Sequence, residues 1–74
     1  MNEIIKELHR DFMGMLSKHT LSEVAELLND WEICRFSNRQ LTVSKVICGN
    51  QYRANLFKGD NIIDVNIKKS EVFC

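Results

Sequence analysis

The sequence predicts an α+β fold in which two N-terminal helices pack on one face of a four-stranded antiparallel meander sheet. Up to about residue 29 the apolar residues recur at helical spacing, and from Trp31 onward they alternate with polar residues as in strands. The dipeptides Gly49-Asn50 and Gly59-Asp60 then mark two hairpin turns. A chain of 74 residues has room for one small core, so we expect a single domain over residues 1–74.

The first helix is expected over about residues 3–18, where the apolar side chains gather on one helical face. These side chains are Ile4, Ile5, Leu8, Phe12, Met15 and Leu16. The second helix is expected over about residues 21–29 and opens with Thr20-Leu21-Ser22-Glu23, which is typical of a capping box. In this motif the Thr20 hydroxyl and the Glu23 carboxylate each accept a hydrogen bond from the other residue's amide. Because almost no residues separate the helices, we expect them to meet at a sharp corner.

The four strands are expected over about residues 31–37, 41–48, 51–58 and 61–68. Glycine takes the positive φ that two-residue hairpin loops require, so we place such loops at Gly49-Asn50 and Gly59-Asp60.

These loops fix the expected strand pairs. The first sets Ile47 opposite Tyr52 and Val43 opposite Leu56, and the second sets Leu56 opposite Ile63. All five apolar residues then share one sheet face, and a slip of one residue would scatter them.

The pairing of the first strand stays open, since no glycine marks the turn that follows it. A two-residue loop at Asn38-Arg39 would set Phe36 against Leu41, Cys34 against Val43 and Glu32 against Lys45. A longer turn would instead point Trp31 and Ile33 toward the helices.

The charges and cysteines limit the classes of function. Ten basic and ten acidic side chains cancel, whereas a dedicated nucleic-acid binder usually carries a basic excess. Cys34, Cys48 and Cys74 form an odd, widely spaced set, which is unlike the disulfide framework of a small secreted protein. The first 20 residues mix charges into the apolar positions, unlike a signal peptide, and the apolar runs are too short to span a bilayer. We therefore expect a cytoplasmic protein with no membrane partner.

The sheet face away from the helices is the candidate binding surface. It mixes aromatic and arginine side chains with small polar ones, a composition typical of protein interfaces. The partner-binding residues expected there are Trp31, Ile33, Arg35, Val46, Arg53, Asn55, Phe57 and Asp64. Scattered surface apolar residues are also common without any role, and a small sheet can turn Trp31 and Phe57 over an edge into the core.

Other kinds of site find little support in the residues. His9 and His19 lie on or beside the first helix, and no cysteine pair has metal-site spacing, so we expect no metal. No glycine-rich phosphate loop, nucleophile elbow or HExxH motif occurs, so we expect no enzymatic activity and no cofactor. Residues 20–28 resemble the first helix of a helix-turn-helix, but a strand follows where the recognition helix should be.

These observations favour a binding module over an enzyme. We expect a small regulator or inhibitor that acts by occupying a partner protein, and self-association into a homodimer because little net charge keeps copies apart. The alternative is a small nucleic-acid-associated regulator that uses Trp31, Arg35, Arg53 and Phe57 on the helix-free face. Small size and the lack of motifs also suggest an origin in a phage or another mobile element.

Overall fold

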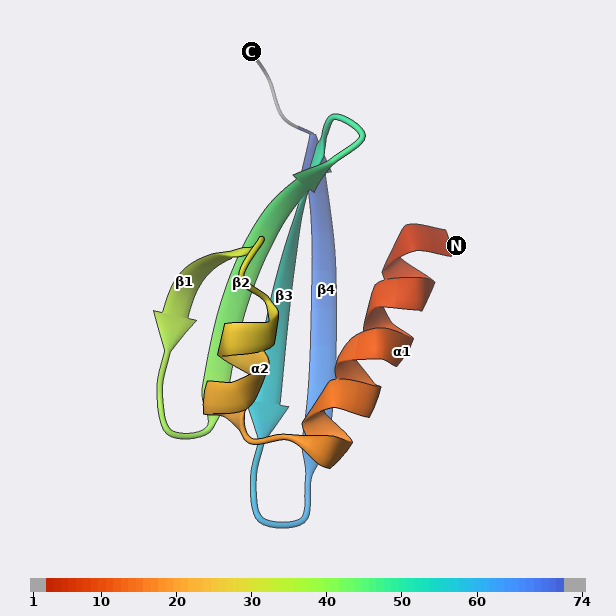
Figure 1. The fold of residues 1–74 in the computed structure, drawn as a ribbon. Helices are drawn as coiled ribbons and strands as arrows, with labels where there is room; N and C mark the ends of the chain where they lie inside the picture. Colours follow the sequence, from red (N-terminus) through yellow and green to blue (C-terminus); the bar gives the residue numbers. More distant parts are fainter. Residues whose placement is uncertain (1–2, 72–74) are drawn as a thin grey trace.

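The computed structural model describes residues 3–71, which form a layer of two helices over a four-stranded sheet (Figure 1). The elements are α1 (Glu3–Lys18), α2 (Leu21–Leu27), β1 (Glu32–Phe36), β2 (Gln40–Ile47), β3 (Asn50–Lys58) and β4 (Ile63–Glu71). The strands lie in the order β1-β2-β3-β4, and each neighbouring pair is antiparallel. This arrangement confirms the predicted α+β fold with a meander sheet.

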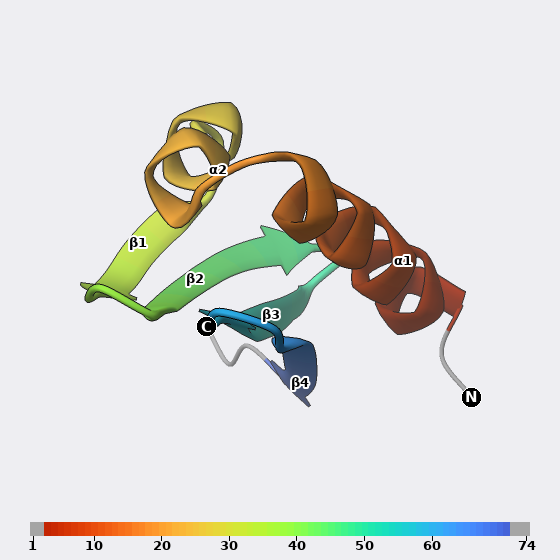
Figure 2. The same ribbon diagram turned by 90° about the horizontal axis from the view of Figure 1, so that it is seen from below.

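Both helices lie on the same side of the sheet (Figure 2). α1 packs mainly against β4, and α2 packs against β2. The helices meet at the expected corner, where His19 and Thr20 separate them. Lys58 at the end of β3 holds this corner, because its Nζ donates a hydrogen bond of 2.6 Å to the His19 carbonyl oxygen. Within residues 3–71, no helix covers the opposite face of the sheet.

The capping box of α2 is present as predicted. The Thr20 hydroxyl accepts a hydrogen bond of 3.3 Å from the Glu23 amide, and the Glu23 carboxylate accepts one of 3.0 Å from the Thr20 amide. The helix ends earlier than expected, at Leu27, where the Leu28 amide donates the closing bond to the Val24 carbonyl.

The core lies between the helices and the covered sheet face. Its buried side chains are Phe12, Leu16, Leu21, Val24, Leu28, Trp31, Leu41, Val43, Tyr52, Ala54, Leu56 and Val65. Along β2 and β3 these residues alternate with residues of the other face, so the inward set predicted from the period of two is confirmed.

The predicted partners across β2 and β3 are wrong by two residues. Tyr52 lies opposite Lys45 rather than Ile47, and Leu56 lies opposite Leu41 rather than Val43. The loop is Cys48-Gly49, whose φ angles of 53° and 82° are both positive. A two-residue hairpin turn with positive φ at both central positions matches the twist of the strands, so the turn starts one residue earlier than expected.

The second hairpin is also paired differently from the prediction. Leu56 lies opposite Val65 rather than Ile63, which pairs with Lys58. The pairing continues to Gly59, whose amide donates to the Ile62 carbonyl at 2.8 Å, so Asp60-Asn61 rather than Gly59-Asp60 form the tip of the loop. The φ of Gly59 lies outside the left-handed region, so the reason given for a tight turn there does not hold.

The first strand follows the two-residue alternative only at its end. Phe36 lies opposite Leu41 as predicted, but the register shifts between Ile33 and Arg35. Ile33 therefore lies opposite Val43, which corrects the expected pairing of Cys34 with Val43. The shift is a β-bulge with Cys34 as the extra residue.

Lys45 also has a different acidic partner from the one expected. Glu32 lies opposite Ser44, and Lys45 instead forms an ion pair with Asp30 in the turn before β1. Lys45 therefore has an acidic partner as predicted, but this partner is Asp30 and not Glu32.

Candidate interaction surfaces

Six of the expected partner-binding residues lie on the helix-free face. The strand register puts them on the same face as Thr42 and Ser44. These residues are Arg35, Val46, Arg53, Asn55, Phe57 and Asp64. The centre of this face is polar and ordered, because the hydroxyl of Thr42 donates a hydrogen bond of 2.6 Å to Oδ1 of Asn55. Thr42 and Ser44 are buried although no described helix covers them.

Trp31 does not lie on that face. Its side chain is 9% exposed and packs in the core, with its ring edge-to-face with Phe12 at 5.4 Å between centroids. The ammonium of Lys45 lies 5.8 Å from the centre of the indole ring. Trp31 precedes β1, in a turn where its amide bonds the Leu28 carbonyl, so the alternation of the strand does not set its direction. This corrects its placement among the residues of the helix-free face and agrees with the alternative in which Trp31 turns into the core.

Ile33 is turned to the other side of the sheet by the bulge. Residues three apart normally point to opposite faces of a strand, yet Ile33 and Phe36 lie opposite Val43 and Leu41, which both face the helices. Each of the two side chains is 47% exposed. Phe36 was not among the expected binding residues, because its predicted place opposite Leu41 put it on the covered face, where it lies at the exposed edge rather than in the core.

Together with the free edge of β1, these two residues form what we call the β1 surface: Ile33, Phe36 and the hollow beside Phe36. All five residues of β1 are exposed, and among residues 3–71 β1 pairs only with β2. The hollow measures about 270 Å³ and lies between the start of α2 and the turn after β1. Its lining consists of Thr20, Leu21, Ser22, Phe36, Ser37, Asn38 and Lys58.

A second feature is a group of cations on β3 and β4. Arg53 and Lys68 lie directly opposite each other, and both line a hollow of about 270 Å³ with Gln51, Lys69 and Ser70. Among the side chains of residues 3–70, Lys45 forms an ion pair with Asp30 and His19 lies 4.0 Å from Glu23, and no acidic partner is found for Arg53, Lys68 or Lys69.

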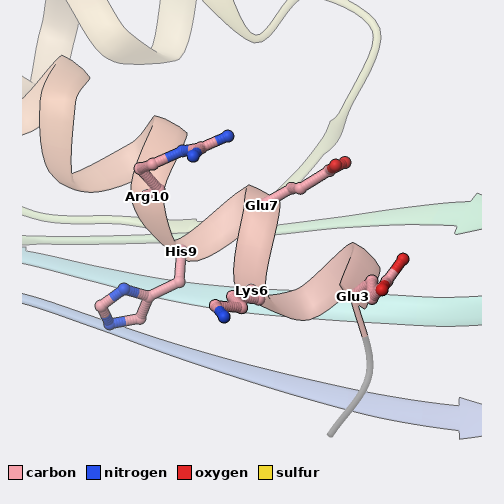
Figure 3. A pocket seen from close by; sticks show the side chains of 5 residues that line it. All are labelled: Glu3, Lys6, Glu7, His9 and Arg10. Carbon is pink, nitrogen blue, oxygen red and sulfur yellow. The ribbon is translucent and has the colours of Figure 1, made fainter.

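The hollow along α1 has the character of ordinary solvated helix surface. It measures about 480 Å³ and is lined by one helix alone, through Glu3, Lys6, Glu7, His9 and Arg10 (Figure 3). Their side chains spread in different directions, with His9 and Lys6 on the side nearer the strands and Arg10 and Glu7 away from it (Figure 3). Charges of both signs alternate here without converging on one point.

The described residues hold no constellation that suggests metal or thiol chemistry. Within residues 3–71, no three His, Cys, Asp or Glu side chains gather as a metal site would require. Cys34 and Cys48 are free and exposed, and the Sγ of Cys34 lies 3.5 Å from the Ser44 hydroxyl. Cys74 lies outside the described residues.

No helix in residues 3–71 combines the length and the apolar character needed to cross a bilayer. Comparison with known proteins gave no match to a protein-family model, to a curated protein or to a solved structure.

Proposed function

We propose that this chain is a small protein-binding regulator or inhibitor that acts by occupying a partner protein through the β1 surface. The observation that supports this is the bulge at Cys34, which turns Ile33 and Phe36 to the same side. Bulges at sheet edges often redirect a side chain for a purpose. Here the result is two half-exposed apolar side chains beside an unpaired strand edge.

The chemistry of this surface suits an extended segment of another protein. The free amides and carbonyls of an edge strand can pair with an added strand, which supplies affinity through main-chain hydrogen bonds. Ile33 and Phe36 would bury their exposed areas against that segment, and aromatic side chains are frequent interface hot spots. A partner that covers this edge would therefore be bound both by main-chain hydrogen bonds and by burial of the two apolar side chains. Such binding requires no catalytic group on this chain.

The proposal predicts that partner binding depends on Phe36 and Ile33. Tagged protein is used to capture partners from nuclease-treated lysate, and the captured proteins are compared between wild type, Phe36→Ser and Ile33→Ser. Loss of a hot-spot side chain should weaken binding about 30-fold, equivalent to about 2 kcal/mol. The matched control is Ile62→Ser, which removes an exposed isoleucine from the β3–β4 loop and should leave capture unchanged.

Other outcomes separate the alternatives. Equal capture by all variants would contradict the use of the β1 surface. Loss with Arg53→Glu and Phe57→Ala alone would instead support the helix-free face as the protein-binding surface. Sedimentation of the purified protein tests for the homodimer, and a dimer abolished by Phe36→Ser would identify the partner as a second copy.

We also infer a cytoplasmic location and an origin in a phage or another mobile element. The free thiols of Cys34 and Cys48 suit a reducing compartment. Phage or mobile-element genes beside the coding sequence would favour an inhibitor of host machinery, and metabolic neighbours would count against it.

A further inference from the structure

The helix-free face carries a second, independent feature that the proposed protein-binding role does not explain. Arg53 and Lys68 lie directly opposite each other on β3 and β4, an arrangement in which like charges repel and lower stability. No ion pair in the described part of the chain relieves this repulsion. The acid of this row, Glu32, lies two strands away from Arg53 with Ser44 between them, so the two cations are each other's direct neighbours.

From this arrangement we infer that the helix-free face binds single-stranded nucleic acid, with a phosphate group held between Arg53 and Lys68. The hollow that these residues line also includes Gln51 and Ser70, so its amide, hydroxyl, ammonium and guanidinium groups all offer hydrogen-bond donors. Arginine and lysine beside such donors match the oxygens of a phosphate group. Local charge of this kind acts on a ligand even where the net charge of the protein is zero.

Side chains suited to nucleotide bases continue along β3 from this hollow. Asn55 and Phe57 lie on the same face as Arg53, about 7 and 13 Å farther along the strand. The Thr42 hydroxyl donates to Oδ1 of Asn55, which leaves the amide nitrogen of Asn55 available to donate to a base. The half-buried Phe57 offers an aromatic ring on which a base can stack.

The position of Asp64 agrees with a nucleic-acid strand whose phosphate lies at Arg53 and whose bases lie at Asn55 and Phe57. Asp64 lies opposite Phe57 and four residues from Lys68 along β4. It is therefore near the side chains proposed to contact bases and far from those proposed to hold the phosphate. A carboxylate there can accept a hydrogen bond from the amino group of a base, whereas it would repel a phosphate. An acidic peptide would use the cations but would be repelled at Asp64, which is why a nucleic acid is favoured.

Fluorescence anisotropy with labelled ten-nucleotide DNA and RNA single strands of mixed sequence tests this inference. We expect binding at low salt that weakens as salt rises, with a slope that corresponds to two or three phosphate contacts at about 0.7 each. Lys68→Glu and Arg53→Glu should each weaken binding at least tenfold. Phe57→Ala should weaken it about fivefold or more without changing the salt slope.

The matched control is Lys6→Glu, which makes the same charge change on the solvated face of α1 and should alter affinity less than twofold. Lys68→Glu has a further signature, because it places a carboxylate opposite Arg53 and should raise the melting temperature while binding is lost. This variant therefore separates loss of binding from loss of folding. The Phe36→Ser variant should bind nucleic acid normally, so this inference and the proposed function can fail independently.

Three results would overturn the inference. The first is no binding at low salt, and the second is an equal loss of affinity with Lys6→Glu. The third combines two observations: polyglutamate of equal charge displaces the nucleic-acid strand, and Phe57→Ala leaves its affinity unchanged. Together they would show that the site binds an acidic peptide instead.

Discussion

Cys48 adopts a φ of 53°, in the left-handed region that residues other than glycine rarely occupy. Gly49 follows with a φ of 82°, so both central positions of the β2–β3 turn have positive φ. Asparagine tolerates this conformation better than cysteine does, because its short polar side chain can bond the local backbone. The turn therefore stores strain at Cys48 that a single substitution can relieve.

We expect Cys48→Asn to raise the free energy of unfolding by about 0.5–1 kcal/mol, since it replaces a residue poorly suited to positive φ. Gly49→Ala should lower it by about 1 kcal/mol or more, because alanine is strained at that φ although the space around the Cβ is open. Urea denaturation of both variants measures the two changes. A stabilising Gly49→Ala variant would show that the turn differs from the one described.

Gly59 has a different role from Gly49, although the two glycines suggest the same turn in the sequence. A Cβ at Gly59 would lie 3.3 Å from Cε1 of Phe57, so this glycine makes room for the aromatic ring on the helix-free face. The sequence shows a glycine before an asparagine or an aspartate in the two cases and cannot distinguish a need for positive φ from a need for space. That ambiguity is why the tip of the second loop was predicted one residue too early.

At the scale of the elements, α2 depends on its first turn because it has only seven residues. So short a helix is marginal by itself and needs capping and packing to form. The capping box satisfies two amides at its start, and Leu21 and Val24 bury its inner face. The Lys58 ammonium then bonds the His19 carbonyl, which ties the corner before α2 to the end of β3.

We expect Thr20→Ala to lower the free energy of unfolding by about 0.5–2 kcal/mol, because it leaves an amide at the helix start unpaired. Glu23→Ala should have a smaller effect, since its carboxylate is exposed. The double variant should lose less than the sum of the single losses, because the two hydrogen bonds form one unit. Strictly additive losses in denaturant melts would contradict this coupling.

For the molecule as a whole, acid should weaken the fold through two carboxylates. The hydrogen bond from the Thr20 backbone is the main cause that lowers the pKa of Glu23, and the hydrogen bond from Lys45 is the main cause that lowers the pKa of Asp30. A carboxyl group with a lower pKa in the folded chain binds fewer protons there than in the unfolded chain. Its stabilisation is present above the unfolded pKa and is lost as pH falls through the folded pKa.

We therefore expect the free energy of unfolding to decline as pH falls below about 4.5. Asp30→Asn should flatten this decline, and Lys45→Met should flatten it similarly because it removes the partner from the same pair. Denaturant melts between pH 3 and pH 7, roughly the range that spans carboxyl titration, measure the effect. An unchanged pH dependence in both variants would show that the ion pair does not act on stability.

The sequence predicted which residues face the core better than it predicted their partners. A shift of two residues leaves every side chain on its original face, so the apolar pattern could not distinguish Lys45 from Ile47 as the partner of Tyr52. The bulge at Cys34 and the turn before Trp31 break the alternation, and neither has a sequence signal. The sequence therefore left the positions of Ile33 and Trp31 as two alternatives, whereas it placed Arg53 and Phe57 on the helix-free face in one way.

The contact between α1 and β4 affects the order in which the chain can fold during synthesis. The first helix packs mainly on the last strand, so Phe12 and Leu16 complete their burial only after residues near Val65 have been made. Domains usually fold as units while they emerge from the ribosome, and here Trp31, α2 and β3 give α1 only part of the cover that β4 completes. Part of the apolar face of α1 therefore stays exposed, or finds temporary cover, until β4 has been made.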